Sequence, residues 1–97
     1  MSRNALERRL IDISDRLKRQ RSDLAVLREQ IEYFDAEADD ARLRALVSET
    51  PLAAADARET QRHADAQHAA LDELLRSIAA HESEQDALLD RMTAELS

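Results

Sequence analysis

The absence of glycine from all 97 residues is the feature that most constrains what this chain can fold into. Phosphate-binding loops, nucleophile elbows, type I′ hairpin turns and dinucleotide-binding turns need positive φ or a close backbone approach, which glycine supplies. The single tyrosine and single phenylalanine are too few for a β-sandwich core or a base-stacking platform. Serine and threonine have no base partner at a recognisable spacing. The sequence therefore predicts an all-α protein that is not an enzyme, with no catalytic residues and no cofactor.

Apolar residues recur along the first half of the chain in alternating steps of four and three. This first seam consists of Leu6, Leu10, Ile13, Leu17, Gln20, Leu24, Leu27, Ile31, Phe34, Ala38, Ala41 and Ala45. A repeat of ~3.5 residues keeps one stripe of a helix facing a partner helix and is typical of a coiled coil. It predicts a first helix over residues 4–48, with Asn4 as N-cap and Glu7 completing a capping box.

The second half carries a similar repeat, out of phase with the first. We predict a second seam of Ala54, Ala57, Gln61, Ala64, His68, Leu71, Leu75, Ile78, Glu82, Gln85, Leu89, Met92 and Leu96. The phase breaks where Thr50 suits an N-cap and Pro51 suits the first position of a helix. We expect a turn over 49–51, a second helix over 51–96, and a single antiparallel coiled-coil hairpin over 1–97. The numbers of facing residues then add to about 99.

The charges favour the antiparallel arrangement, and the size of the core predicts association. Residues 1–30 carry eight basic and five acidic side chains, whereas residues 69–97 carry two and seven, so these ends attract each other. One seam between two helices buries little apolar surface against the entropy of ordering the whole chain. Because Leu74, His81 and Leu88 lie beside the second seam, we predict that they form the oligomer interface of a homodimer, a four-helix bundle.

The residues around the predicted turn are the candidate partner-binding site. Apolar side chains that lie off the seam alternate there with carboxylates, and we call this set the turn patch: Leu43, Leu46, Val47, Glu49, Leu52, Asp56 and Glu59. Its apolar side chains either fold over the turn and cap the bundle or dock a protein partner. The sequence predicts a protein–protein interaction module, an adaptor or scaffold with an acidic, partly apolar surface.

Two alternative functions remain open. Carboxylates at the end of an antiparallel helical finger resemble, in architecture, the transcription factors that insert such a finger into the secondary channel of RNA polymerase. The acidic motif and the glycine-bearing globular domain of those families are not recognisable here. The resemblance implies a regulator of a large machine such as RNA polymerase.

The second alternative is a metal-binding helical bundle. Asp65 and His68 stand three residues apart, and Glu32 or Asp35 would lie near them in the hairpin. Carboxylates with a carboxylate-x-x-His motif on facing helices hold the metals of ferritin-like bundles. Here the motif begins with aspartate and occurs once, so solvated histidines and no metal are the preferred interpretation.

The remaining expectations concern nucleic acid, membranes and compartment. The basic residues between 8 and 21 alternate with acidic ones in a chain of net charge −7, so we do not expect nucleic-acid binding. The sequence has no cysteine, no apolar leader and no apolar run near the ~18 residues of a membrane span. We expect a cytoplasmic protein that does not bind membranes, and its preference for arginine over lysine is typical of a GC-rich bacterial genome.

Overall fold

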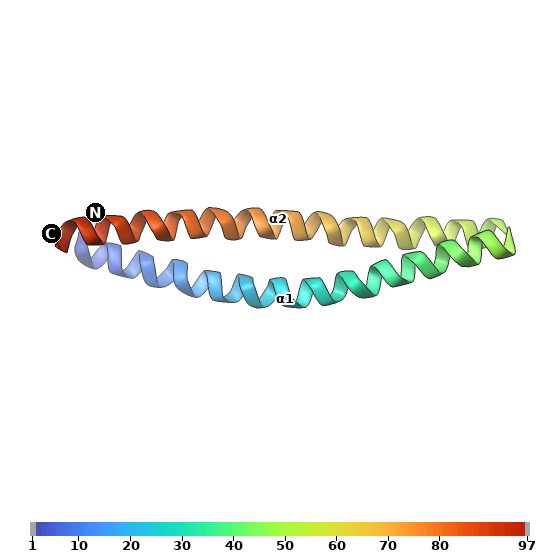
Figure 1. Cartoon of the computed structure of the whole chain (residues 1–97), viewed down its shortest axis with the longest axis horizontal. Coiled ribbons are helices and arrows are strands. Elements are labelled where there is room, and N and C mark those ends of the chain that lie inside the picture. The colour runs from blue at the N-terminus through green and yellow to red at the C-terminus, as the bar shows by residue number, and fades with distance from the viewer. Residues whose placement is uncertain (1, 97) are drawn as a thin grey trace. The chain divides into compact units, whose positions relative to one another are not determined.

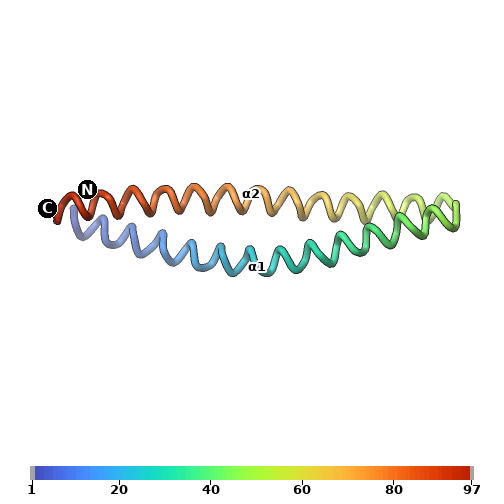
Figure 2. Tube along the Cα trace, viewed as in Figure 1, coloured from blue at the N-terminus to red at the C-terminus, as the bar shows by residue number. Residues whose placement is uncertain are grey.

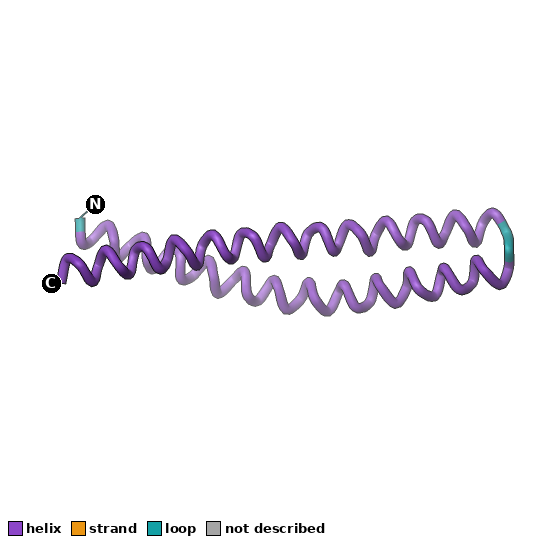
Figure 3. Tube along the Cα trace, turned by 45° about the horizontal axis from the view of Figure 1, so that its top comes forward, coloured by secondary structure: helices purple, strands orange, loops and turns teal. Residues whose placement is uncertain are grey.

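The computed structural model describes residues 2–96, which form two helices (Figure 1). Helix α1 spans Arg3–Ser48 and helix α2 spans Pro51–Leu96. Two residues, 49 and 50, connect them, and Figure 3 shows no strand among the described residues. The helices begin and end within one residue of the predicted bounds, and the all-α helical hairpin is confirmed.

The chain divides into two compact units, each built from both helices. Unit 1 comprises 1–24 and 74–97, and unit 2 comprises Ala25–Glu73. In unit 1 the start of α1 and the end of α2 lie side by side, blue and red in Figure 2. Within each unit the contacts run antiparallel. Side-chain contacts join residue 9 of α1 to residue 84 of α2 and residue 21 to residue 82 in unit 1. In unit 2 they join residue 35 to residue 68 and residue 44 to residue 56.

Helix α1 begins after Ser2. The Ser2 hydroxyl oxygen accepts a hydrogen bond from the backbone N–H of Ala5 at 3.2 Å, an N-cap contact. The prediction of a capping box at Asn4 is therefore wrong. Asn4 lies inside the helix, and the Glu7 carboxylate pairs with Arg3 at 3.3 Å. An equally good capping residue two positions earlier lengthens the helix, which explains the difference.

The turn between the helices is short and depends on both helix ends. The hydroxyl oxygen of Thr50 accepts a hydrogen bond from the N–H of Ala53 at 3.2 Å, and Pro51 takes the first helical position, as predicted. Glu49 has φ = 52°, in the left-handed region, while its N–H donates to the Ala45 carbonyl at 3.1 Å. Glycine is the usual residue at such a helix end, because a Cβ costs about 1–2 kcal/mol there.

The first seam is confirmed, and the second is confirmed at Ala54 and at every seventh residue from Ala57. All twelve first-seam side chains, from Leu6 to Ala45, are buried or half-buried. On α2 the correct positions are Ala54, Ala57, Ala64, Leu71, Ile78, Gln85 and Met92. The positions between them are wrong by one residue. The exposed side chains there are Gln61, His68, Leu75, Glu82, Leu89 and Leu96, and those inside are Thr60, Gln67, Leu74, His81 and Leu88.

Charge explains which phase of α2 faces inward. The predicted and the observed seam of α2 share every seventh residue, so the apolar side chains that each would bury distinguish them poorly. The phase in the structure leaves Glu82 in solvent, where its carboxylate pairs with the guanidinium of Arg21 at 3.2 Å. Burying that carboxylate in the seam would cost far more than exposing Leu75 or Leu89.

This phase corrects the predicted oligomer interface. Leu88 is 5% exposed and belongs to the core of unit 1, Leu74 packs against that core, and His81 bonds to α1. These three side chains make their contacts inside the chain, so they do not form a free flank. The homodimer stays a prediction. The exposed large apolar side chains of α2 in unit 1 are Leu75, Leu89 and Leu96.

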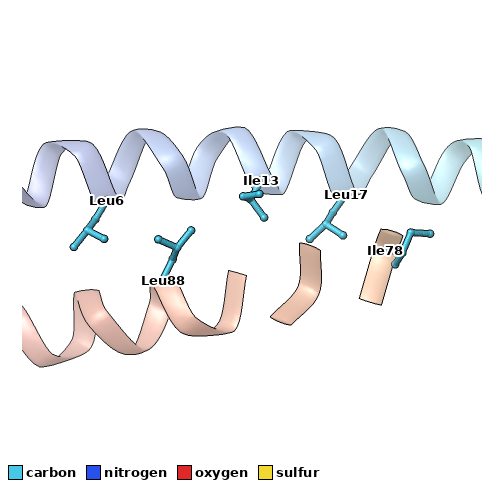
Figure 4. Packing of buried hydrophobic residues seen from close by; sticks show 5 residues of the cluster. All are labelled: Leu6, Ile13, Leu17, Ile78 and Leu88. Carbon is cyan, nitrogen blue, oxygen red and sulfur yellow. The ribbon is translucent and has the colours of Figure 1, made fainter. Parts of the chain in front are cut away.

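Large aliphatic side chains fill the core of unit 1 (Figure 4). Leu6, Ile13 and Leu17 extend from α1 toward Leu88 and Ile78 of α2. Such side chains contribute ~1.5–3 kcal/mol each when fully buried. This cluster is the main apolar core that the described residues form.

A polar layer interrupts the core of unit 1 at Gln20. Its amide Nε2 donates to the Ser77 hydroxyl at 2.8 Å, and its Oε1 accepts from His81 Nδ1 at 2.9 Å. Farther along, Gln85 Nε2 donates to the Ser14 hydroxyl at 3.1 Å. The side-chain amides of Gln20 and Gln85 therefore have partners on the other helix, which offsets the desolvation cost of placing them between helices.

Unit 2 has a core of small side chains. Its buried apolar residues are Ile31 and three alanines, Ala38, Ala41 and Ala64. Phe34 is half-buried and supplies the largest side chain of this seam. Unit 2 therefore buries less apolar surface per residue than unit 1.

Candidate functional site

The net charge of the chain lies entirely on unit 2. Residues 25–73 contain twelve acidic and five basic side chains, a net charge of −7 with neutral histidines. Residues 1–24 and 74–97 contain nine of each sign and are neutral overall. Unit 2 therefore attracts cationic molecules, and the attraction weakens as salt is added.

The apolar side chains of the turn patch project into solvent. Leu43, Leu46, Val47 and Leu52 are between 56% and 86% exposed. They do not bury one another over the turn, so the capping interpretation is not what the structure shows. Leu43 and Val47, with Arg44 and Ser48, line a shallow hollow of about 430 Å³ on α1.

The carboxylates of the turn patch differ in their partners. Asp56 pairs with Arg44 across the two helices at 3.5 Å, and both side chains are more than half exposed. Exposed pairs of this kind contribute ~0–1 kcal/mol. Glu49 and Glu59 are exposed and make no ion pair with a described residue. The patch therefore combines apolar surface with two carboxylates that are available to a cation.

The two aromatic side chains form a second hollow in unit 2, which the sequence analysis missed. The rings of Tyr33 and Phe34 meet edge to face at 5.6 Å, and Phe34 meets the His63 ring at 6.4 Å. Together with Glu37 and Thr60 these residues line a hollow of about 160 Å³, which we call the aromatic notch. The adjacency of Tyr33 and Phe34 was a partial signal, but the sequence does not show that His63 lies beside them.

The residues considered for a metal do not come together. His68 Nε2 lies 2.9 and 3.0 Å from the two carboxylate oxygens of Asp35, which makes a two-residue pair. Asp65 instead accepts a hydrogen bond from Gln61 on its own helix at 2.9 Å. Among residues 2–96 no group of three or more histidine, cysteine, aspartate or glutamate side chains is placed to hold a metal ion.

The basic side chains between residues 8 and 21 of α1 have different acidic neighbours. Arg9 pairs with Glu84 of α2 at 2.6 Å, and Arg21 pairs with Glu82. Arg16 shares a hollow of about 220 Å³ with acidic neighbours that include Asp12. The stretch therefore presents mixed charge.

Neither described helix contains a segment both long and apolar enough to cross a membrane. Comparisons with protein-family models, with curated proteins and with solved structures give no match to this chain.

Proposed function

We propose that this chain is a non-enzymatic interaction module that binds a protein partner through the turn patch. The observation that supports this proposal is the exposure of four large apolar side chains close to the turn, Leu43, Leu46, Val47 and Leu52. Clustered exposed apolar side chains with a polar rim are typical of protein-binding surfaces. Rigid helices on both sides hold the patch in one arrangement, which lowers the entropy cost of binding.

The charge of unit 2 indicates the chemistry of the partner. Glu49 and Glu59 lie beside the apolar side chains without an ionic partner among the described residues. A partner with an apolar centre and basic residues around it would bury the leucines and neutralise these carboxylates. Charge complementarity of this kind mainly raises the association rate and the specificity.

Site-specific photo-cross-linking tests the proposal. A photoreactive amino acid replaces Val47 in cells that express the chain natively, and a matched variant carries it at Ile11, an exposed apolar position in unit 1. We expect a defined protein adduct from position 47 that is missing from position 11. Adding Leu46→Asp, or reversing the charge of Glu49 and Asp56, should remove the adduct.

Two results would contradict the turn patch as the binding site. One is the same adduct from both photoreactive positions, and the other is an adduct from position 47 that Leu46→Asp leaves unchanged. Mass spectrometry of the adduct also tests the alternative drawn from architecture, since a polymerase regulator would cross-link to RNA polymerase subunits.

A further inference from the structure

The outward surface of α1 in unit 2 carries a second repeat with three-four spacing, beside the one that packs on α2. Its apolar members are Val26, Tyr33, Ala36, Leu43 and Val47, and all of them are exposed. Glu29 and Asp40 occupy the two remaining positions of the same repeat and are also exposed. We call these seven residues the outer stripe. Steps of three and four place them on one face of the helix.

We propose that the outer stripe binds one amphipathic, basic α-helix of a partner protein, which packs along α1 as a third strand of coiled coil. This inference rests on the proposed function, because it names the chemistry of the partner that the module binds. It also extends the binding surface beyond the turn patch, since Leu43 and Val47 belong to both while Val26 and Tyr33 belong to the outer stripe alone.

The spacing of the outer stripe is what identifies the occupant as a helix. A continuous three-four repeat is complementary to the same repeat on another helix, whose side chains pack between those of α1. At ~1.5 Å per residue the stripe is about 33 Å long, which matches a helix of about six turns. In unit 1 the same face of α1 continues with Asp12, Asp15, Arg19 and Ser22, so the apolar repeat stops at Val26.

The charge on this face indicates that the occupant is basic. Glu29 and Asp40 interrupt the apolar side chains, Glu37 lies beside them, and none of the three pairs with a cation among the described residues. A second copy of the chain would bring the −7 charge of its own unit 2 against this face if the copies paired through the stripe. Lysine or arginine opposite these carboxylates satisfies them without that repulsion.

The aromatic notch opens beside the outer stripe and suits one cationic side chain. Tyr33 is common to both, and the hollow of about 160 Å³ is also lined by Phe34, Glu37, Thr60 and His63. A guanidinium or ammonium group there would contact aromatic rings and a carboxylate at the same time. A basic residue of the bound helix therefore contributes most to the affinity at this place on α1.

Binding of a synthetic helix tests the inference directly. The probe is a fluorescently labelled peptide of about 24 residues with leucine and alanine at three-four spacing and lysine and arginine beside them. Its controls are a peptide with glutamate in place of every basic residue and a peptide of the same composition with scrambled spacing. We expect micromolar binding of the basic probe by fluorescence anisotropy, and binding at least about tenfold weaker for each control.

Matched variants of the chain locate the probe. Tyr33→Asp and Val26→Asp lie in the outer stripe, whereas Leu46→Asp lies in the turn patch and off the stripe. We expect the first two to weaken probe binding at least about tenfold and Leu46→Asp to change it less than about twofold. Asp40→Asn with Glu29→Gln keeps the shape of the stripe and should flatten the salt dependence of binding. Circular dichroism checks that each variant stays helical.

The outcomes separate this inference from the proposed function. Equal binding of basic and acidic peptides, or equal binding to the Tyr33→Asp chain, would overturn the inference. So would a dimer of the chain alone that Tyr33→Asp converts to monomer, because the occupant would then be a second copy. If Leu46→Asp abolishes the cellular adduct while the basic probe fails to bind, the proposed function stands and the outer stripe is wrong.

Discussion

Replacing Glu49 by glycine should stabilise this chain, although glycine is absent from its sequence. Glu49 adopts φ = 52° at the end of α1, its side chain is exposed, and it makes no ion pair with a described residue. A residue with a Cβ loses about 1–2 kcal/mol in the left-handed region. Glycine removes that loss but adds ~0.4–1 kcal/mol of chain entropy to the unfolded state. We expect a net gain of about 0.5–1 kcal/mol in the free energy of unfolding.

Glu59→Gly is the matched control, because it makes the same chemical change inside a helix. Glu59 is exposed and lies in the third turn of α2, where glycine is a poor helix former. We expect it to lower the free energy of unfolding by about 0.5–1 kcal/mol. Both variants remove one negative charge from unit 2, so the change in charge repulsion cancels in the comparison.

Urea unfolding followed by circular dichroism at 222 nm measures both changes. The two variants should lie on opposite sides of the wild type, separated by about 1–2 kcal/mol and by at least about 4 °C in Tm. Equal destabilisation by both glycines would refute the reasoning, because it would mean that the turn gains nothing from a residue suited to positive φ. A further variant, Glu49→Asn, should fall between the wild type and Glu49→Gly, since asparagine tolerates this region better than glutamate.

Three other changes follow from the packing and the caps, each measured by urea unfolding. Thr50→Ala removes the N-cap of α2 and should cost ~1 kcal/mol, and Thr50→Ser should restore most of the loss. Leu88→Ala should cost about 2–4 kcal/mol because the side chain is buried, whereas the same change at Leu89, which is 46% exposed, should cost less than about 1 kcal/mol. A larger loss of unfolding free energy for Leu89→Ala than for Leu88→Ala would show that Leu89 lies in the seam, as the sequence predicted. Gln20→Ala leaves two half-buried polar partners unpaired and should cost about 1–2 kcal/mol, against less than ~0.5 kcal/mol for Gln61→Ala on the surface.

The two helices show how far apolar spacing predicts a coiled coil. On α1 the seam was predictable throughout, because its positions from Leu6 to Ala45 carry no charged side chain, whereas every other three-four series along the helix does. On α2 leucines stand in adjacent pairs, Leu74 with Leu75 and Leu88 with Leu89, so steps of three-four and four-three fit equally well. The side chain that separates the phases is Glu82, whose carboxylate belongs in solvent opposite Arg21.

The candidate site was predictable in part, for a related reason. The apolar side chains of the turn patch lie off the first seam, so their exposure follows once that seam is known. The aromatic notch was not predictable, because it needs Phe34 and His63 to meet across the two helices. The outer stripe was not predicted, because Glu29 and Asp40 interrupt its apolar residues, whereas the first seam carries no charged residue.

The small side chains between the helices of unit 2 bear on how that part of the chain opens. Leucine has three more carbons than alanine, so an alanine such as Ala38 or Ala64 in the seam contributes about 2 kcal/mol less than a leucine there. Backbone amides of unit 2 should therefore exchange with deuterium through local fluctuations, and those around Leu17 only when the whole chain unfolds. A ligand on the outer stripe would slow exchange across unit 2, and occupancy of the module would be visible as a gain in amide protection far from any contacted atom.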